Sequence, residues 1–200
     1  MIITCVILLF VQKRSLEKEL SIIRQKAARS EDGRIQERGK VRVLESNVIL
    51  AAQSTGKAIN SKIQLTDVNN KKRTTTEIFA GKTPVLVFRY SPQGCSPCIN
   101  TTFEHLGRLK ESVGSNKLRI IVIPNNMDLR QMVVEGVHPL KSQFDFYLAD
   151  ENGLGLPGDE MLVSYLSIVD GGKTSNVFVV DSMFLPLLER HINALIEVYK

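Results

Sequence analysis

The sequence predicts an α/β fold in which a mixed sheet is flanked by helices. Two short apolar runs rich in β-branched residues, Val85–Phe88 and Leu118–Pro124, are typical of strands buried on both faces. Between them, apolar residues recur every three or four positions, which indicates a helix. Strand, helix and strand in this order form a right-handed parallel βαβ unit. With 43% hydrophobic residues and no Trp among its 200 residues, the chain can build an aliphatic core.

The chain begins with an almost entirely apolar decapeptide, Ile2–Val11. At about 1.5 Å per residue, a helix of this length spans only about half of a bilayer core. Lys13 and Arg14 follow the apolar run, whereas a secretory signal carries its positive charge before it. We therefore expect residues 1–12 to be an uncleaved membrane anchor. A cleaved or truncated signal and a buried segment of a soluble protein are the alternatives.

Residues 13–56 are expected to form a charged helical spacer. Basic residues concentrate here, which gives most of the net charge of +5, but they alternate with acidic ones. Such a mixed-sign run is typical of a solvated helix face, or of a stretch over anionic lipid headgroups, rather than of a nucleic-acid surface. We expect Ser30–Gly33 to interrupt the helix. The stretch would hold the domain off a membrane, and a coiled-coil dimer contact is an alternative, although too few apolar positions repeat to predict one.

The remaining residues, 57–200, are expected to form one domain. It starts with a strand at Lys62–Val68, a turn at Asn69–Lys71, and a hairpin strand or short helix from Thr74 to Phe79. The later elements are a helix at Asp128–Val137, a strand at Phe144–Ala149, a hairpin of Leu162–Val169 with Ser175–Val180, and a closing helix at Met183–Tyr199.

A pair of cysteines, Cys95 and Cys98, follows the first apolar strand and opens the helix of the βαβ unit. At this spacing two cysteines lie close enough to form a disulfide. The unpaired N–H groups and the positive dipole at a helix start favour a thiolate, so Cys95 is predicted to be the nucleophile. Cys98, one turn deeper, is better shielded and suits the role of the resolving thiol. Pro97 fits the first turn, where its missing N–H costs no hydrogen bond.

This strand, loop, C-x-x-C and helix resemble the active-site segment of the thioredoxin fold. The upstream segments Ile63–Asp67, Asn69–Lys71 and Glu77–Pro84 are similar to the lead-in of the TlpA/ResA-type membrane-tethered thioredoxins. The resemblance implies a thiol–disulfide oxidoreductase on the extracytoplasmic (periplasmic) side of a bacterial membrane. Its partners would be protein disulfides or dithiols and a membrane-embedded reductant, with no cofactor, no metal and no nucleic acid.

The chain departs from this family at three places. Gly94 stands where most relatives have Trp directly before the first cysteine. No proline occupies the slot of the family's cis-proline, which falls near Leu162 or Val163, and this would weaken substrate docking. Arg89 stands at about the position of the buried acid that assists proton transfer to the resolving thiol. A cation there would favour a thiolate rather than act as a base.

Two other functions are compatible with the fold. A thioredoxin-like binding or scaffold module would keep the cysteines without relaying electrons, and the missing cis-proline favours it. A peroxidase of the peroxiredoxin type needs a Thr or Ser three residues before its nucleophile, and Pro92 occupies that position.

A zinc site needs four ligands, and His105, His138 and His191 are scattered without ligand spacing.

Overall fold

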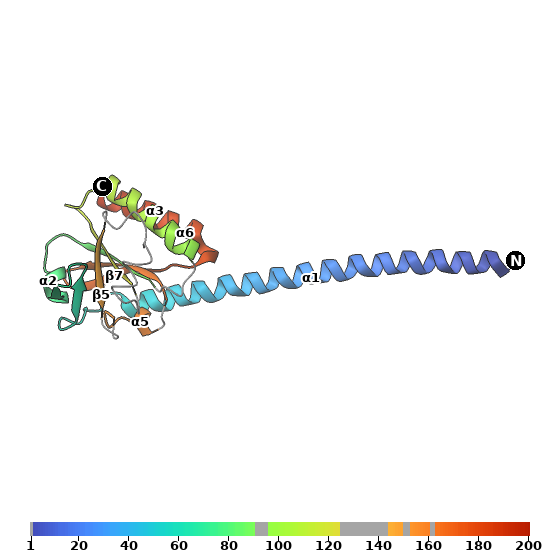
Figure 1. The fold of residues 1–200 in the computed structure, drawn as a ribbon, viewed down its shortest axis with the longest axis horizontal. Coiled ribbons are helices and arrows are strands. Elements are labelled where there is room, and N and C mark those ends of the chain that lie inside the picture. Colours follow the sequence, from blue (N-terminus) through green and yellow to red (C-terminus); the bar gives the residue numbers. More distant parts are fainter. Residues whose placement is uncertain (1, 91–95, 125–143, 150–152, 161–162) are drawn as a thin grey trace. The chain divides into compact units, whose positions relative to one another are not determined.

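The computed structural model describes residues 2–90, 96–124, 144–149, 153–160 and 163–200 (Figure 1). The chain divides into two compact units, Met1–Arg42 and Val43–Lys200.

Helix α1 runs without a break over Ile2–Ser54, a length of 53 residues. The expected interruption at Ser30–Gly33 is therefore wrong. No proline occurs before Pro84, and a glycine within a helix costs about 1 kcal/mol, which weakens a helix but does not end it. Among the described residues, no helix combines the length and the apolar character needed to cross a membrane.

The second unit is built on a seven-stranded mixed sheet with the order β2-β1-β5-β4-β3-β6-β7. Its strands are β1 (Gln64–Asp67), β2 (Lys72–Thr74), β3 (Val85–Tyr90), β4 (Arg119–Pro124), β5 (Asp145–Ala149), β6 (Tyr165–Asp170) and β7 (Lys173–Val179). Strand β3 lies at the centre, parallel to β4 and antiparallel to β6. Every residue of β3 is buried.

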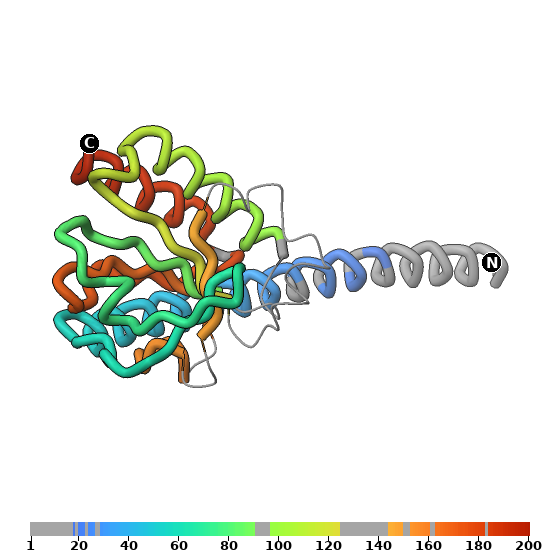
Figure 2. The backbone as a smooth tube through the Cα atoms, turned by 60° about the vertical axis from the view of Figure 1, so that its left-hand side comes forward, coloured from blue at the N-terminus to red at the C-terminus, as the bar shows by residue number. Residues whose placement is uncertain are grey.

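Two apolar clusters pack on the two faces of this sheet. On one face, Phe88 and other side chains pack with helices α3 (Ser96–Val113) and α6 (Leu185–Tyr199), which lie side by side (Figure 2). On the other face, Val87 belongs to a cluster with residues of α2 (Thr75–Phe79) and with Leu50 from the last turns of α1. This mixed sheet flanked by helices fits the thioredoxin-like fold that the sequence predicts.

The last turns of α1 are also tied to β7 by hydrogen bonds. The side-chain oxygen of Asn47 accepts a hydrogen bond from the N–H of Val179, with an O···N distance of 2.6 Å. The hydroxyl of Thr174 donates to the carbonyl of Ser54. The backbone carbonyl of Thr174 accepts a hydrogen bond from the N–H of Gly56 at 2.7 Å. These bonds occupy polar groups along the outer strand of the sheet.

Most predicted elements of this unit are confirmed. Thr74 caps α2, where it forms a capping box with Glu77. The parallel βαβ unit, the β6–β7 hairpin and the closing helix are all present. A short helix, α5 (Pro157–Glu160), and a 3-10 turn at Ser182–Phe184 were not expected. The predicted helix at Asp128–Val137 lies outside the described residues.

His191 of α6 is half-buried, and its ring stacks on Phe178 with a centroid distance of 4.7 Å. Within the described part of the chain, its Nε2 has no hydrogen-bond partner. Burial lowers the pKa of His191 from 6.5 to about 4. The folded state therefore holds this imidazole neutral at pH values where the unfolded chain protonates it.

Stability should consequently fall as the pH drops from about 6.5 through 4, because the unfolded state binds a proton that the folded state does not. We expect this residue to account for about 1 to 2 kcal/mol of unfolding free energy, since one pKa unit is worth 1.36 kcal/mol and partial exposure reduces the full value. Urea unfolding at several pH values, with wild type and His191→Phe, measures it. The variant should lose this part of the pH dependence of the unfolding free energy. An unchanged pH dependence would show that groups other than His191 cause it.

Candidate active site

The candidate site lies where β3 ends and α3 begins. Helix α3 starts at Ser96, so Cys98 falls within its first turn. Cys98 is 2% exposed and takes part in a disulfide bond. Cys95 and Gly94 lie outside the described residues, and the chain has one further cysteine, Cys5. The structure therefore provides one buried, oxidised sulfur at the position predicted for the shielded thiol.

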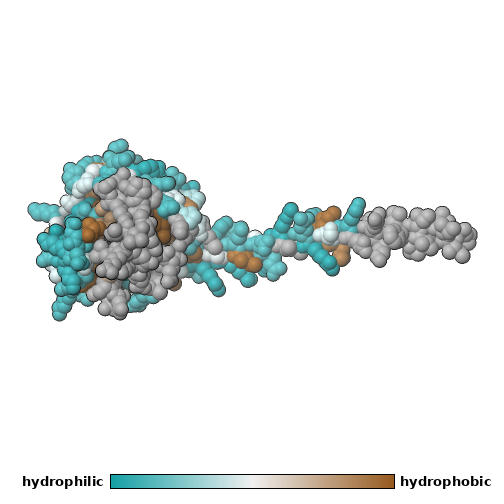
Figure 3. Space-filling view, in the orientation of Figure 1, coloured by the Kyte–Doolittle hydropathy of each residue, from teal (hydrophilic) through white to brown (hydrophobic). Residues whose placement is uncertain are grey.

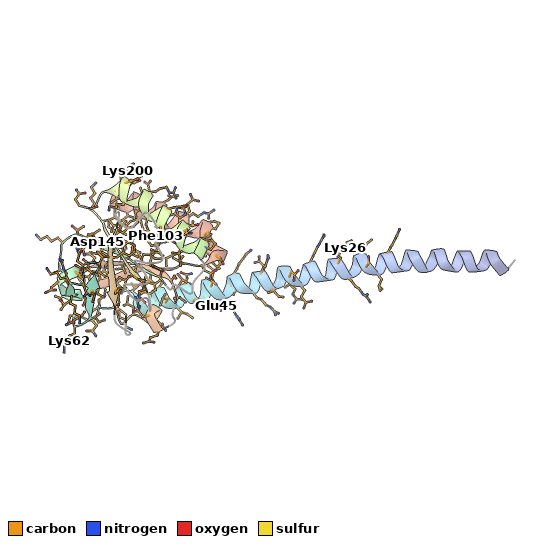
Figure 4. The ribbon with its side chains drawn as sticks, viewed as in Figure 1. Lys26, Glu45, Lys62, Phe103, Asp145 and Lys200 are labelled. Carbon is orange, nitrogen blue, oxygen red and sulfur yellow. The ribbon has the colours of Figure 1, made fainter. Side chains whose placement is uncertain are left out.

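The surroundings of Cys98 are apolar and aromatic. It belongs to the cluster of Phe88, Tyr90 and Phe103, whose ring centroids lie 5.4 to 5.9 Å apart. Figure 4 labels Phe103 in this part of the interior. The carbonyl of Cys98 accepts a hydrogen bond from the hydroxyl of Thr102 at 2.7 Å, which is common within a helix. These contacts hold the Cys98 sulfur inside the domain, away from solvent.

A buried ion pair lies near the end of the same strand. Arg89 of β3 is 1% exposed, and its Nε lies 2.7 Å from Oδ1 of Asp159 in α5. Its Nη1 donates a hydrogen bond to the carbonyl of Pro124, the last residue of β4, at 2.6 Å. Side chains alternate along a strand, so Arg89 shares the face of Val87, opposite Phe88 and Tyr90.

The Asp159 carboxylate also accepts hydrogen bonds from three other groups. The backbone N–H groups of Leu154 and Leu156 donate to its Oδ2 at 2.8 and 3.1 Å, and the hydroxyl of Tyr165 donates to its Oδ1 at 3.3 Å. Tyr165 lies opposite Arg89 in the β3–β6 pairing. Burial, and then the Asp159 charge, raise the pKa of Tyr165 well above its ordinary value. The network thus joins β3, β4, β6 and α5 where β3 and β4 end and β6 begins.

Sequence reasoning located Arg89 but missed Asp159. It predicted a cation that favours a thiolate, whereas the structure pairs this cation with a carboxylate, so the charge is largely compensated. One signal could have revealed the partner: an arginine within a strand buried on both faces requires an acid nearby. Of the other predicted positions, Val163 is half-buried against the cluster that contains Val87, and Leu162 lies outside the described residues.

No group of three His, Cys, Asp or Glu side chains that could hold a metal ion occurs in the described part of the chain. A surface hollow of about 300 Å³ lies between α2 and the β6–β7 turn, lined among others by Phe79, Gly171 and Gly172. None of its lining residues belongs to the Cys98 surroundings or to the Arg89 network.

No family model and no curated protein matches this sequence. Among solved structures, the chain is similar to an uncharacterized thioredoxin-like protein from Porphyromonas gingivalis, with a TM-score of 0.49 and 16% identity over 70% of this chain and 92% of the other. A thiol:disulfide interchange protein from Bacteroides sp. gives a TM-score of 0.48 and 17% identity over 70% and 90% of the two chains. The mitochondrial 2-cys peroxiredoxin from Plasmodium falciparum gives 0.46 and 16% over 72% and 95%. At such TM-scores, the strand order and connections described above carry the fold assignment.

Proposed function

We propose that this thioredoxin-like chain is a thiol–disulfide oxidoreductase that exchanges electrons with protein disulfides through Cys95 and Cys98. The observation that carries the proposal is Cys98: a buried, disulfide-bonded sulfur in the first turn of a helix that follows a central parallel strand. A purely structural disulfide needs no helix start, whereas a nucleophilic cysteine gains from one.

In the reducing direction, the Cys95 thiolate attacks one sulfur of a substrate disulfide. A mixed disulfide forms, and the other substrate sulfur leaves as a thiolate that takes up a proton. Cys98 then loses its proton and attacks the Cys95 sulfur, which releases the second substrate thiol and leaves Cys95 and Cys98 oxidised. Two electrons pass from the cysteine pair to the substrate. The same steps in reverse would oxidise a substrate dithiol.

The proposal includes a location on the extracytoplasmic side of a bacterial membrane, with a membrane-embedded reductant restoring the pair. The apolar decapeptide Ile2–Val11 and the resemblance of the 57–200 region to membrane-tethered thioredoxins support it. Fractionation of cells that express the full chain, followed by carbonate washing, tests the attachment. Deletion of residues 2–11 should move the protein to the soluble fraction. Recovery of the full chain in that fraction would contradict the attachment.

The chemical proposal is tested by titrating the cysteines in glutathione redox buffers and alkylating the thiols that remain at each potential. A Cys5→Ser background makes the readout specific for the remaining two. We expect both thiols to disappear together in one two-electron step, within about −120 to −270 mV, the range of thioredoxin-like oxidoreductases. If Cys95 stays free while Cys98 is oxidised in the wild type, the pair does not exist and the proposal is wrong.

A scaffold function without electron transfer is the second candidate. It is favoured by the sequence at the substrate-docking slot, which falls near Leu162 or Val163 and holds no proline there. The cysteine pair of a scaffold could still be oxidised in one two-electron step. The rate of disulfide exchange with a substrate therefore distinguishes a scaffold from an oxidoreductase.

A further inference from the structure

In the first unit, almost every side chain of α1 that the structure describes is exposed to solvent. From residue 29 to Arg38, every described side chain is exposed, and further towards the N-terminus Leu20 is 50% exposed. In proteins, most helical stability comes from packing of an apolar face rather than from intrinsic propensity. Gly33 and Gly39 each lower the propensity of this stretch further. A helix with this composition calls for a surface to pack against.

The sequence of α1 contains a heptad pattern, in which the apolar residues are spaced along the helix rather than clustered. Counting alternately by four and three from Leu16 gives the seam positions: Leu16, Leu20, Ile23, Ala27, Ser30, Arg34, Glu37 and Val41. Five of these eight positions are apolar, against three of the other eighteen between residues 16 and 41. The same count continues in the sequence to Leu44 and Val48, which are 45% and 67% exposed.

The pattern is not visible as one stripe on a straight helix. A heptad repeat drifts by about 20° per seven residues relative to a straight α-helix, so it aligns only when two helices supercoil. Figure 3 shows apolar (brown) residues scattered among hydrophilic ones along the coloured part of α1, without one continuous stripe. The seven-residue repeat of apolar positions distinguishes a coiled-coil seam from the broad apolar face of a helix that packs on a globular domain.

The charged residues beside the seam indicate that the partner of α1 is a second, parallel copy of this chain. In a parallel, in-register dimer, the residue before each first heptad position faces the residue five places further along the other helix. In this chain these pairs are Glu19 with Arg24, Lys26 with Glu31, and Lys40 with Glu45. Each joins opposite charges. The remaining pair, Gly33 with Arg38, holds a single charge, so none of the four is repulsive.

We propose that α1 joins two copies of this chain in a parallel, in-register coiled coil along the seam positions of residues 16–41. Lys26 and Glu31 are exposed in the single chain, and Lys26 projects from the helix (Figure 4). Lys40 contacts Glu37 within its own helix at 2.7 Å, and it would exchange this exposed contact for Glu45 of the second copy. The polar seam residues Ser30, Arg34 and Glu37 lower the stability of the dimer. Arg34 and Glu37 occupy successive seam layers, so Arg34 of one copy can pair with Glu37 of the other, whereas the seam positions beside Leu20, at 16 and 23, are apolar and would offer an acid no cation.

The proposal does not depend on the thiol chemistry, and sedimentation equilibrium of the full chain tests it. We expect a concentration-dependent dimer. Leu20→Asp, on the seam, should raise the dissociation constant by at least about a hundredfold, because two carboxylates would be buried against each other. Ile22→Asp is the matched control, since Ile22 is off the seam and equally exposed, at 51% against 50%. It should leave the dimer intact.

Cysteine cross-linking tests the orientation, in a chain whose native cysteines are replaced by serine. Ser30→Cys and Val41→Cys should each form a disulfide-linked dimer under mild oxidation, because equivalent seam positions meet in a parallel pair. Asp32→Cys, on the outer side of the helix, should not. An antiparallel pair could link at one seam position at most. A monomeric wild type, equal effects of Leu20→Asp and Ile22→Asp, or linkage at only one seam position would overturn the proposal.

A charge exchange provides the final arm. Lys26→Glu should weaken the dimer by placing like charges opposite each other, and adding Glu31→Lys should restore it. If the double variant remains as weak as the single one, the two residues do not face each other across the dimer. Loss of the dimer in Leu20→Asp with an unchanged redox titration would show that assembly and thiol chemistry are separate properties.

Discussion

In the Cys95→Ser variant, insulin reduction by dithiothreitol should fall to the rate of dithiothreitol alone. Serine has no ionisable sulfur, so the attack that opens the substrate disulfide cannot occur. Turbidity of the precipitating insulin chain measures the rate. Cys5→Ser is the control and should retain the wild-type rate. A wild-type rate that equals that of Cys95→Ser would identify the chain as a scaffold.

The Cys98→Ser variant should fail in a different way. Cys95 would still attack the substrate, but no second thiol could resolve the mixed disulfide. We expect a covalent complex with the substrate that non-reducing electrophoresis detects and that dithiothreitol dissolves. Both cysteine variants should remain folded. If Cys98→Ser reduces insulin as fast as the wild type, Cys98 is not the resolving thiol.

Arg89→Met should reduce the free energy of unfolding by about 3 to 5 kcal/mol, because it leaves the buried Asp159 carboxylate without its cation. Methionine fills a similar volume, so the loss reflects charge rather than a cavity. The Asp159 side chain is 7% exposed, and its hydrogen bonds from Leu154, Leu156 and Tyr165 do not replace a full positive charge. Chemical denaturation followed by circular dichroism measures the change.

Two variants control for this interpretation. Arg89→Met combined with Asp159→Leu removes both charges and should recover much of the lost stability. Arg108 and Glu189 form an ion pair at 3.6 Å with side chains that are 49% and 51% exposed, so Arg108→Met should cost less than about 1 kcal/mol. Equal losses for Arg89→Met and Arg108→Met would show that burial does not govern these pairs.

The sequence was sufficient for elements whose signals are local. The apolar run of β3 and the three-to-four spacing of Phe103, Leu106 and Leu109 in α3 each lie within a few residues of chain. The position of Cys98 followed from the same segment. Its burial depends on long-range packing, yet it could be expected because Cys98 lies eight residues before Leu106 and therefore on the same apolar face of the helix.

The features that were missed depend on distant residues. Arg89 and Asp159 are 70 positions apart, and nothing near Asp159 in the sequence distinguishes it from a turn residue. The continuity of α1 was missed for the opposite reason. Ser30–Gly33 has the local composition of a break, but helix formers on both sides carry the helix through it.

The hydrogen bonds that tie Asn47 and Ser54 to β7 have a practical meaning for protein production. An outer strand with open N–H and C=O groups invites pairing with another molecule, and here the end of α1 blocks part of it. A shortened chain that starts at residue 57 would expose this strand and also empty the place of Leu50 in the interior. A soluble fragment for crystallisation should therefore start at or before Val43.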